Sequence, residues 1–287
     1  MSDISASLVK ELRDKTGAGM ADCKKALVET DGDMSAAIEF LRKKGAASAA
    51  KRADKAANEG VIAARTNQNK NIAAILEVNC ETDFVARNAE FDGFVNKVAD
   101  ALLENDVNTI DELKALSIGN DTVLGMYNEL LAKFSEKIEI RRMNRWVSEG
   151  TIASYIHAGN KLAILVEVNA PNLNDEAFAI LRDIAMQIAA MNPQFITRQD
   201  VDNTTLEKEI EIYKQQAIES GKKAEIAEKI AQGRIEKYYN ESCLVEQAFV
   251  KDSSLSISDV LKKIGELAGT EVKVTRFLRY SLGESES

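Results

Sequence analysis

The chain has 287 residues, of which 45% are hydrophobic and 29% charged, as is ordinary for a globular protein of about two domains. Its net charge of −9 argues against nucleic acid as a direct partner, because proteins that bind phosphate backbones usually carry basic surfaces. A single histidine, three dispersed cysteines and the lack of a phosphate-binding loop motif argue against a metal site, a bound cofactor and most catalytic triads, so we do not expect an enzyme.

Residues 1–45 are predicted to form a module of three short helices. Apolar residues at helical spacing mark the first helix, which includes Leu12, and the second, which begins near Met20. Asp33 is a good N-cap for the third helix, and Gly45 is predicted to end it. Because so small a bundle is marginally stable alone, we expect it to serve as a recognition module.

Residues 46–58 are rich in Ala, Lys and Arg and are predicted to form a solvated linker or an extension of the preceding helix. A local basic stretch begins just before this segment and contains Arg42, Lys43, Lys44, Lys51, Arg52 and Lys55. The alternative interpretation of this stretch is a docking site for an acidic or phosphorylated surface.

The most informative feature is an internal repeat, in which residues 60–80 align without a gap with residues 150–170. Both copies contain the triplet Glu-Val-Asn, and each is typical of a β-hairpin followed by an amphipathic helix. Two copies of one such unit predict an α+β fold with antiparallel sheets and a pseudo-symmetric core. We therefore expect core subdomain N at 59–145 and core subdomain C at 146–282.

A helical hairpin is predicted within the second subdomain, as an insertion at about 200–240 with Gly221 at its turn. Its expected seam residues are Leu206, Ile210, Tyr213 and Ala217, with Ile226, Ile230 and Gly233 on the return helix. The pattern favours an antiparallel coiled-coil arm that packs on itself, and the alternative is a homodimer formed through this helical arm. A strand over 272–280 is expected to complete the second sheet, before a tail at 283–287.

Thr82, Asp83, Phe84 and Val85 follow the hairpin of the first copy and have no counterpart in the second. Segments that both copies share are explained by their common fold. A segment found in only one copy is therefore a candidate for function. Thr82 or Asp83 fits the N-cap of a helix, which would leave Phe84 tucked into the core of its own subdomain. The other interpretation is an exposed aromatic beside a carboxylate on a rigid corner, suited to insertion into a partner.

The sequence also predicts a compartment. No run approaches the ~18 apolar residues that a membrane span needs, and the N-terminus lacks the pattern of a signal segment. Cys23, Cys80 and Cys243 form no CxxC pair and fit a reducing environment. We therefore expect a cytoplasmic protein without a membrane partner.

Three segments closely resemble bacterial elongation factor Ts: the run SLVKELRDKTGAGMADCKKAL, the helix GDMSAAIEFLRKKG and the corner VNCETDFVARNAEF. The order of the parts is also similar, so the resemblance covers nearly the whole chain. It implies a translation factor of protein biosynthesis that binds elongation factor Tu carrying GDP and promotes guanine nucleotide exchange. It further implies that the N-terminal module has a ubiquitin-associated-like fold.

The resemblance also implies roles for individual residues. Those matched to the partner's Mg²⁺ site are Thr82, Asp83, Phe84 and Val85, with Phe84 as a wedge and Asp83 helping to move the groups that hold the ion. Those matched to other partner contacts are Leu12, Arg13, Met20, Lys24 and His157, with Leu12 and Met20 as the apolar part of the contact. Glu81 stands where some relatives carry a neutral residue, so its charge is expected to tune the corner.

Three other functions compete with this one. The basic residues of 42–55 and 141–145 could bind RNA, with affinity that falls steeply with salt. The crevice between the two core copies could hold the pocket of a small-molecule enzyme. A pure scaffold would dimerise through the arm and bind a GTPase without altering its affinity for nucleotide.

Overall fold

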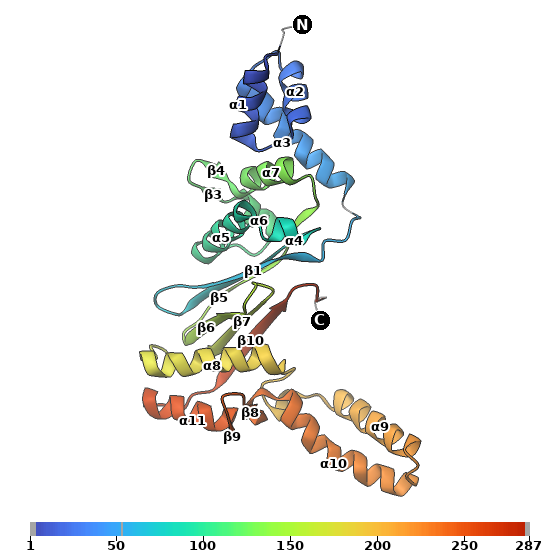
Figure 1. The fold of residues 1–287 in the computed structure, drawn as a ribbon. Coiled ribbons are helices and arrows are strands. Elements are labelled where there is room, and N and C mark those ends of the chain that lie inside the picture. Colours follow the sequence, from blue (N-terminus) through green and yellow to red (C-terminus); the bar gives the residue numbers. More distant parts are fainter. Residues whose placement is uncertain (1–3, 53, 285–287) are drawn as a thin grey trace.

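The computed structural model describes residues 4–52 and 54–284 (Figure 1). The first three helices, α1 (Ala6–Thr16), α2 (Met20–Glu29) and α3 (Met34–Lys51), form the N-terminal module. Ser5 caps α1 by accepting a hydrogen bond from the amide of Leu8, and Gly17 ends the helix in the left-handed conformation, with φ of 68°. The core of the module includes Leu12 and Cys23, both fully buried.

Helix α3 is longer than expected. The prediction that Gly45 ends it is wrong, because the helix continues to Lys51. Gly45 instead faces α7 (Val123–Phe134), where a Cβ on this residue would lie 2.6 Å from the backbone nitrogen of Ala132. Only glycine permits so close an approach of two helix backbones. The first part of the predicted linker at 46–58 is therefore helical, and α3 reaches from the module to the core (Figure 1).

Core subdomain N is built on a three-stranded antiparallel sheet of order β1-β2-β5. Its strands are β1 (Glu59–Thr66), β2 (Ile72–Cys80) and β5 (Ile138–Val147). One face is covered by α5 (Ala89–Glu104), whose Phe91, Phe94 and Val98 are buried against it. The remaining elements are α4 (Asp83–Ala86), α6 (Ile110–Ala115), α7 and the small hairpin of β3 (Ser117–Ile118) and β4 (Asp121–Thr122).

Core subdomain C repeats this plan with a sheet of order β10-β7-β6. Its strands are β6 (Thr151–Ile156), β7 (Leu162–Val168) and β10 (Val274–Ser281), so the strand expected to complete the second sheet is confirmed. The sheet is covered by α8 (Asp175–Met191), and α11 (Ile257–Ala268) packs against α8 (Figure 1). Smaller elements are η1 (Arg198–Asp200), η2 (Leu244–Glu246), β8 (Ala248–Phe249) and β9 (Asp252–Ser256). The α+β fold class is therefore confirmed.

The two sheets pack face to face, and the repeat is visible in how they meet. The amide of Ile62 donates a 2.7 Å hydrogen bond to the carbonyl of Asn160, and the equivalent amide of Ile152 donates one of 2.7 Å to the carbonyl of Lys70. Alternate strand residues fill the junction, because successive side chains point to opposite faces of a strand. This buried cluster comprises Ile62, Ala64, Ala73, Ile75, Trp146, Ile152, Ala163, Leu165 and Tyr280.

The helical arm consists of α9 (Asn203–Glu219) and α10 (Ala224–Ser242), which turn at Gly221 with φ of 85° and extend away from the sheets (Figure 1). The seam on α10 differs from the prediction. Ile226 is 49% exposed, while its neighbour Ala227 is fully buried. The two helices fill their own seam, and pairing of arms between two chains stays a prediction.

Candidate functional site

The corner after β2 presents Phe84 to solvent. Thr82 is the N-cap of α4, and its hydroxyl accepts a hydrogen bond of 3.4 Å from the amide of Val85. Val85 is buried, whereas the side chain of Phe84 is 83% exposed, the highest value for a large hydrophobic residue in the described part of the chain. The interpretation that Phe84 is tucked into its own core is therefore wrong, and the exposed aromatic is confirmed.

Two carboxylates hold the backbone of this corner. Glu81 accepts hydrogen bonds from Nε and Nη2 of Arg52, at 2.7 and 2.6 Å, and from the amide of Lys137 at 2.6 Å. The Arg52 guanidinium, followed by the Lys137 amide, lowers the pKa of the Glu81 carboxyl to about 2. Glu136 accepts from the amide and the hydroxyl of Thr82, at 3.1 and 2.8 Å. The exposed ring therefore sits on a fixed base.

Asp83, beside the aromatic ring, is held only weakly. Its carboxylate lies 3.2 Å from the guanidinium of Arg87, which is 81% exposed, one helical turn away. Exposed pairs of this spacing contribute about 0.3–0.5 kcal/mol, so the carboxylate can exchange this partner for another at little cost.

Cys80 ends β2 directly below the corner and serves as packing. Its thiol donates to the carbonyl of Thr82 at 3.2 Å. Burial, together with the nearby Glu136 carboxylate, raises the pKa of the Cys80 thiol to about 12. Because the thiolate is the nucleophilic form of cysteine, this residue is poorly suited to nucleophilic chemistry.

The N-terminal module carries the second group of predicted site residues. Arg13, Met20 and Lys24 are exposed on α1 and α2, as a contact surface requires. Leu12 is a correction, because its side chain is fully buried in the module's core and supports the surface without forming it. Val28, which is 47% exposed, lies one helical turn from Lys24 on α2 and adds an apolar side chain to the same face.

His157 lies in the turn between β6 and β7 of core subdomain C and is exposed. Its Nδ1 is 3.0 Å from the hydroxyl of Tyr155. The predicted residues thus occur on three separate units: Met20 on the module, Phe84 on subdomain N and His157 on subdomain C. They do not converge on one pocket.

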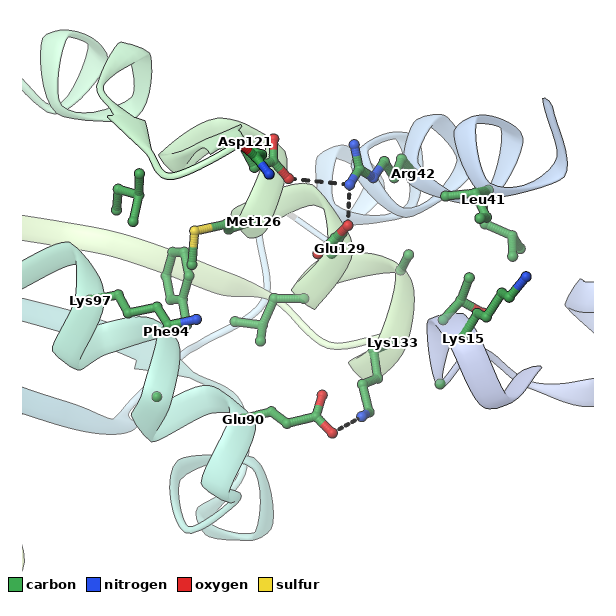
Figure 2. Close-up of a pocket in the computed structure, with 18 of the residues that line it drawn as sticks. Lys15, Leu41, Arg42, Glu90, Phe94, Lys97, Asp121, Met126, Glu129 and Lys133 are labelled. Atoms are coloured by element: carbon green, nitrogen blue, oxygen red, sulfur yellow. Dashed lines mark hydrogen bonds and ion pairs between the residues drawn. The ribbon is translucent and has the colours of Figure 1, made fainter. Parts of the chain in front are cut away.

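A cleft of about 990 Å³ lies between the module and core subdomain N. Figure 2 shows that Arg42 of α3 reaches across it to Asp121 and Glu129, whereas Lys133 pairs with Glu90 within core subdomain N. The charged groups in its wall are thus largely neutralised by one another. The crevice between the two core copies, proposed for an enzyme, is filled by the apolar cluster between the sheets.

The basic stretches considered for RNA binding are largely paired within the chain. Arg142 of β5 is 7% exposed and bonds the buried Glu77 at 2.6 Å. Other pairs are Arg42 with Asp121 and Glu129, Lys44 with Asp22, Arg52 with Glu81, and Arg145 with Asp106. These pairings neutralise the charge that an RNA site would need.

Over residues 4–52 and 54–284, no helix is long and apolar enough to cross a membrane. In the same ranges, no three His, Cys, Asp or Glu side chains are grouped so that they could hold a metal ion.

Comparison with known proteins identifies the family. The family model for "Elongation factor TS" matches residues 81–284. Elongation factor Ts of Chloroherpeton thalassium is 49% identical, over 99% of this chain and 100% of its own length. The protein of the same name from Prosthecochloris aestuarii is 48% identical over the same shares, and that of Clostridium perfringens is 45% identical over 98% of this chain and 93% of its own length. The chain therefore belongs to the elongation factor Ts family of translation elongation factors.

Proposed function

We propose that this protein binds elongation factor Tu carrying GDP and accelerates the release of GDP for exchange with GTP. The observation that carries the proposal is the exposure of Phe84 on a corner whose backbone is otherwise fixed. Binding energy at protein interfaces concentrates in aromatic side chains that become buried in the partner. Phe84 acts as a wedge near the partner's Mg²⁺ site, and Asp83 draws away groups that hold the ion.

The proposed mechanism needs no catalytic group. A factor that binds the nucleotide-free state of its partner better than the GDP state shifts the partner toward release, and GDP weakens the factor in return. The module contributes Arg13, Met20 and Lys24 to this binding, and core subdomain C contributes His157. No bond is made or broken, so the protein acts as an exchange factor and not as an enzyme.

The test is release of a fluorescent GDP analogue from elongation factor Tu at increasing concentrations of factor. We expect Phe84→Ala to lower the maximal release rate by about 30-fold, the equivalent of a hot spot of ~2 kcal/mol. Its stability should change by less than about 0.5 kcal/mol, because the ring is solvated in the free chain. Val147→Ala is the matched control, since this side chain is also exposed, at 60%, and lies on β5.

The Mg²⁺ part of the proposal has its own readout. Removing Mg²⁺ with a chelator should speed spontaneous release and bring Phe84→Ala closer to the wild type, because the wedge then has less to displace. If the gap between the two proteins is unchanged without Mg²⁺, the wedge acts elsewhere. If the folded wild type gives no acceleration with Mg²⁺ present, the exchange-factor proposal is wrong.

A further inference from the structure

Helix α3 connects the N-terminal module physically to the Phe84 corner. Near its start, Ala37 and Leu41 are buried in the module. Further along, Gly45 packs against the backbone of α7. Just beyond its end, Arg52 makes the bidentate pair with Glu81, the residue that precedes Thr82. Helix α3 and the residue that follows it thus link the core of the module to the base of the Phe84 corner.

Helix α7 holds the same corner from the other side. It ends at Phe134, and the next residues supply the Glu136 carboxylate to Thr82 and the Lys137 amide to Glu81. Because α3 and α7 also pack on each other at Gly45, the two helices form a frame around the base of the corner. The Glu81 carboxylate joins the segments that follow these two helices, since it accepts hydrogen bonds from Arg52 after α3 and from the amide of Lys137 after α7.

We propose that Arg52 and Glu81 are positioning residues for nucleotide exchange, whose pair fixes the Phe84 corner relative to the N-terminal module. This inference rests on the proposed function. Once the first surface is bound, a fixed arrangement reduces the ordering cost of engaging the second. It also makes engagement of the second surface an intramolecular step once the first is bound. Breaking the pair leaves the residues of both contact surfaces unchanged and loosens only the position of one surface relative to the other.

The geometry of the pair supports this role over a mere surface ion pair. The Glu81 side chain is 15% exposed and that of Arg52 36%, and both carboxylate oxygens of Glu81 are engaged. Bidentate arginine–carboxylate pairs fix orientation as well as distance. The lowered pKa of the Glu81 carboxyl, about 2, has the Arg52 guanidinium as its main cause.

The first experiment measures the pair without any partner. Hydrogen exchange of the free protein should show faster exchange of the amides of Thr82, Val85 and Lys137 in Arg52→Ala than in the wild type. Arg198→Ala is the matched control: this arginine is 38% exposed and makes a bidentate pair with Glu246, and a second pair with Glu236, in core subdomain C. Unchanged exchange at the corner in Arg52→Ala would overturn the inference, whether or not the protein acts on elongation factor Tu.

The second experiment is a double-mutant cycle of Arg52→Ala and Glu81→Ala in the GDP-release assay. We expect each single variant to lower the maximal release rate about tenfold and the double variant to lower it no further, as for residues that act through one contact. The half-saturating concentration should change little. A variant that was only partly folded would instead need more protein to reach the wild-type maximum.

The charge swap Arg52→Glu with Glu81→Arg separates positioning from direct contact with the partner. Positioning predicts partial recovery of the maximal rate relative to either reversal alone. If Arg52 touches the partner itself, the losses of maximal rate in the two single variants will add in the double variant. The charge swap will then not recover the rate. An inactive wild type would count against the proposed function, whereas an active wild type with unaffected Arg52→Ala would count against the positioning pair alone.

Discussion

The guanidinium of Arg142 lies over the ring of Tyr280, 4.1 Å from its centre, across the junction of the two core subdomains. The relationship is repeated in the opposite direction, because Arg276 lies 4.2 Å from the centre of the Trp146 ring. Each arginine therefore reaches from the edge strand of its own sheet to an aromatic ring on the edge strand of the other. This reciprocal packing extends the pseudo-symmetry of the repeat to β5 and β10, whose sequences are not visibly alike.

The two arginines differ in burial, which gives a stability prediction. Arg142 pairs with Glu77, which is fully buried, whereas Arg276 is 42% exposed and pairs with Glu167. Arg142→Ala should cost about 3–5 kcal/mol of unfolding free energy, because it leaves a buried carboxylate without its main partner. Arg276→Ala should cost about 1 kcal/mol or less. Urea unfolding measures both, and equal losses would contradict the assignment of Glu77 as the buried anchor.

The arginine pairs also explain which strands of the core can be predicted from the sequence and which cannot. The hairpins of the repeat are predictable, because their apolar and β-branched residues alternate as strands require. Strand β5 was missed, because Arg142 and Arg145 within it look like solvated charge when only one chain segment is read. Their partners, Glu77 and Asp106, are distant in sequence, and only the fold brings them together.

The crossing of α3 and α7 gives a second prediction. Gly45→Ala should destabilise the docking of the module by about 1–3 kcal/mol, because the added methyl overlaps the backbone of Ala132 and the helices must separate. Gly233→Ala in α10 should have the opposite sign, a gain of about 0.5–1 kcal/mol, because nothing lies within 4 Å and alanine favours the helix. Thermal unfolding compares them, with limited proteolysis after α3 as a second readout. Stabilisation by both substitutions would mean that the helices do not touch at Gly45.

The candidate site was predictable in part for a related reason. Phe84 was singled out because its segment interrupts an otherwise shared repeat. Leu12 was assigned a partner contact by resemblance, although its place on the apolar face of the first helix already indicated that it is buried within the module. The Arg52–Glu81 pair joins two connecting segments that are distant in sequence, so no local pattern reveals it.

Protonation of Glu81 at acid pH should weaken its pair with Arg52 at the Phe84 corner. The pKa of Glu81 is about 2 in the folded protein, chiefly because of Arg52, and about 4.3 in an unfolded chain. A lowered carboxyl pKa contributes stability that is complete above about pH 4.3 and is lost as the pH falls toward 2. The difference in unfolding free energy between wild type and Glu81→Gln should therefore be constant from pH 5 to 8 and shrink below pH 4. A difference that does not change on acidification would show that the carboxylate is not stabilised by this pair.

The cap of α4 can be tested separately from the ion pair. Thr82→Val keeps the shape of the side chain but removes a hydroxyl that donates to Glu136 at 2.8 Å and caps the amide of Val85. We expect a loss of about 1 kcal/mol, together with faster hydrogen exchange at Val85 and slower GDP release. Ser256→Ala, which removes the cap of α11 in core subdomain C, should cost a similar amount without changing either property. If both variants slow GDP release equally, the cause is lower global stability. If only Thr82→Val slows it, the cause is the lost rigidity of the corner.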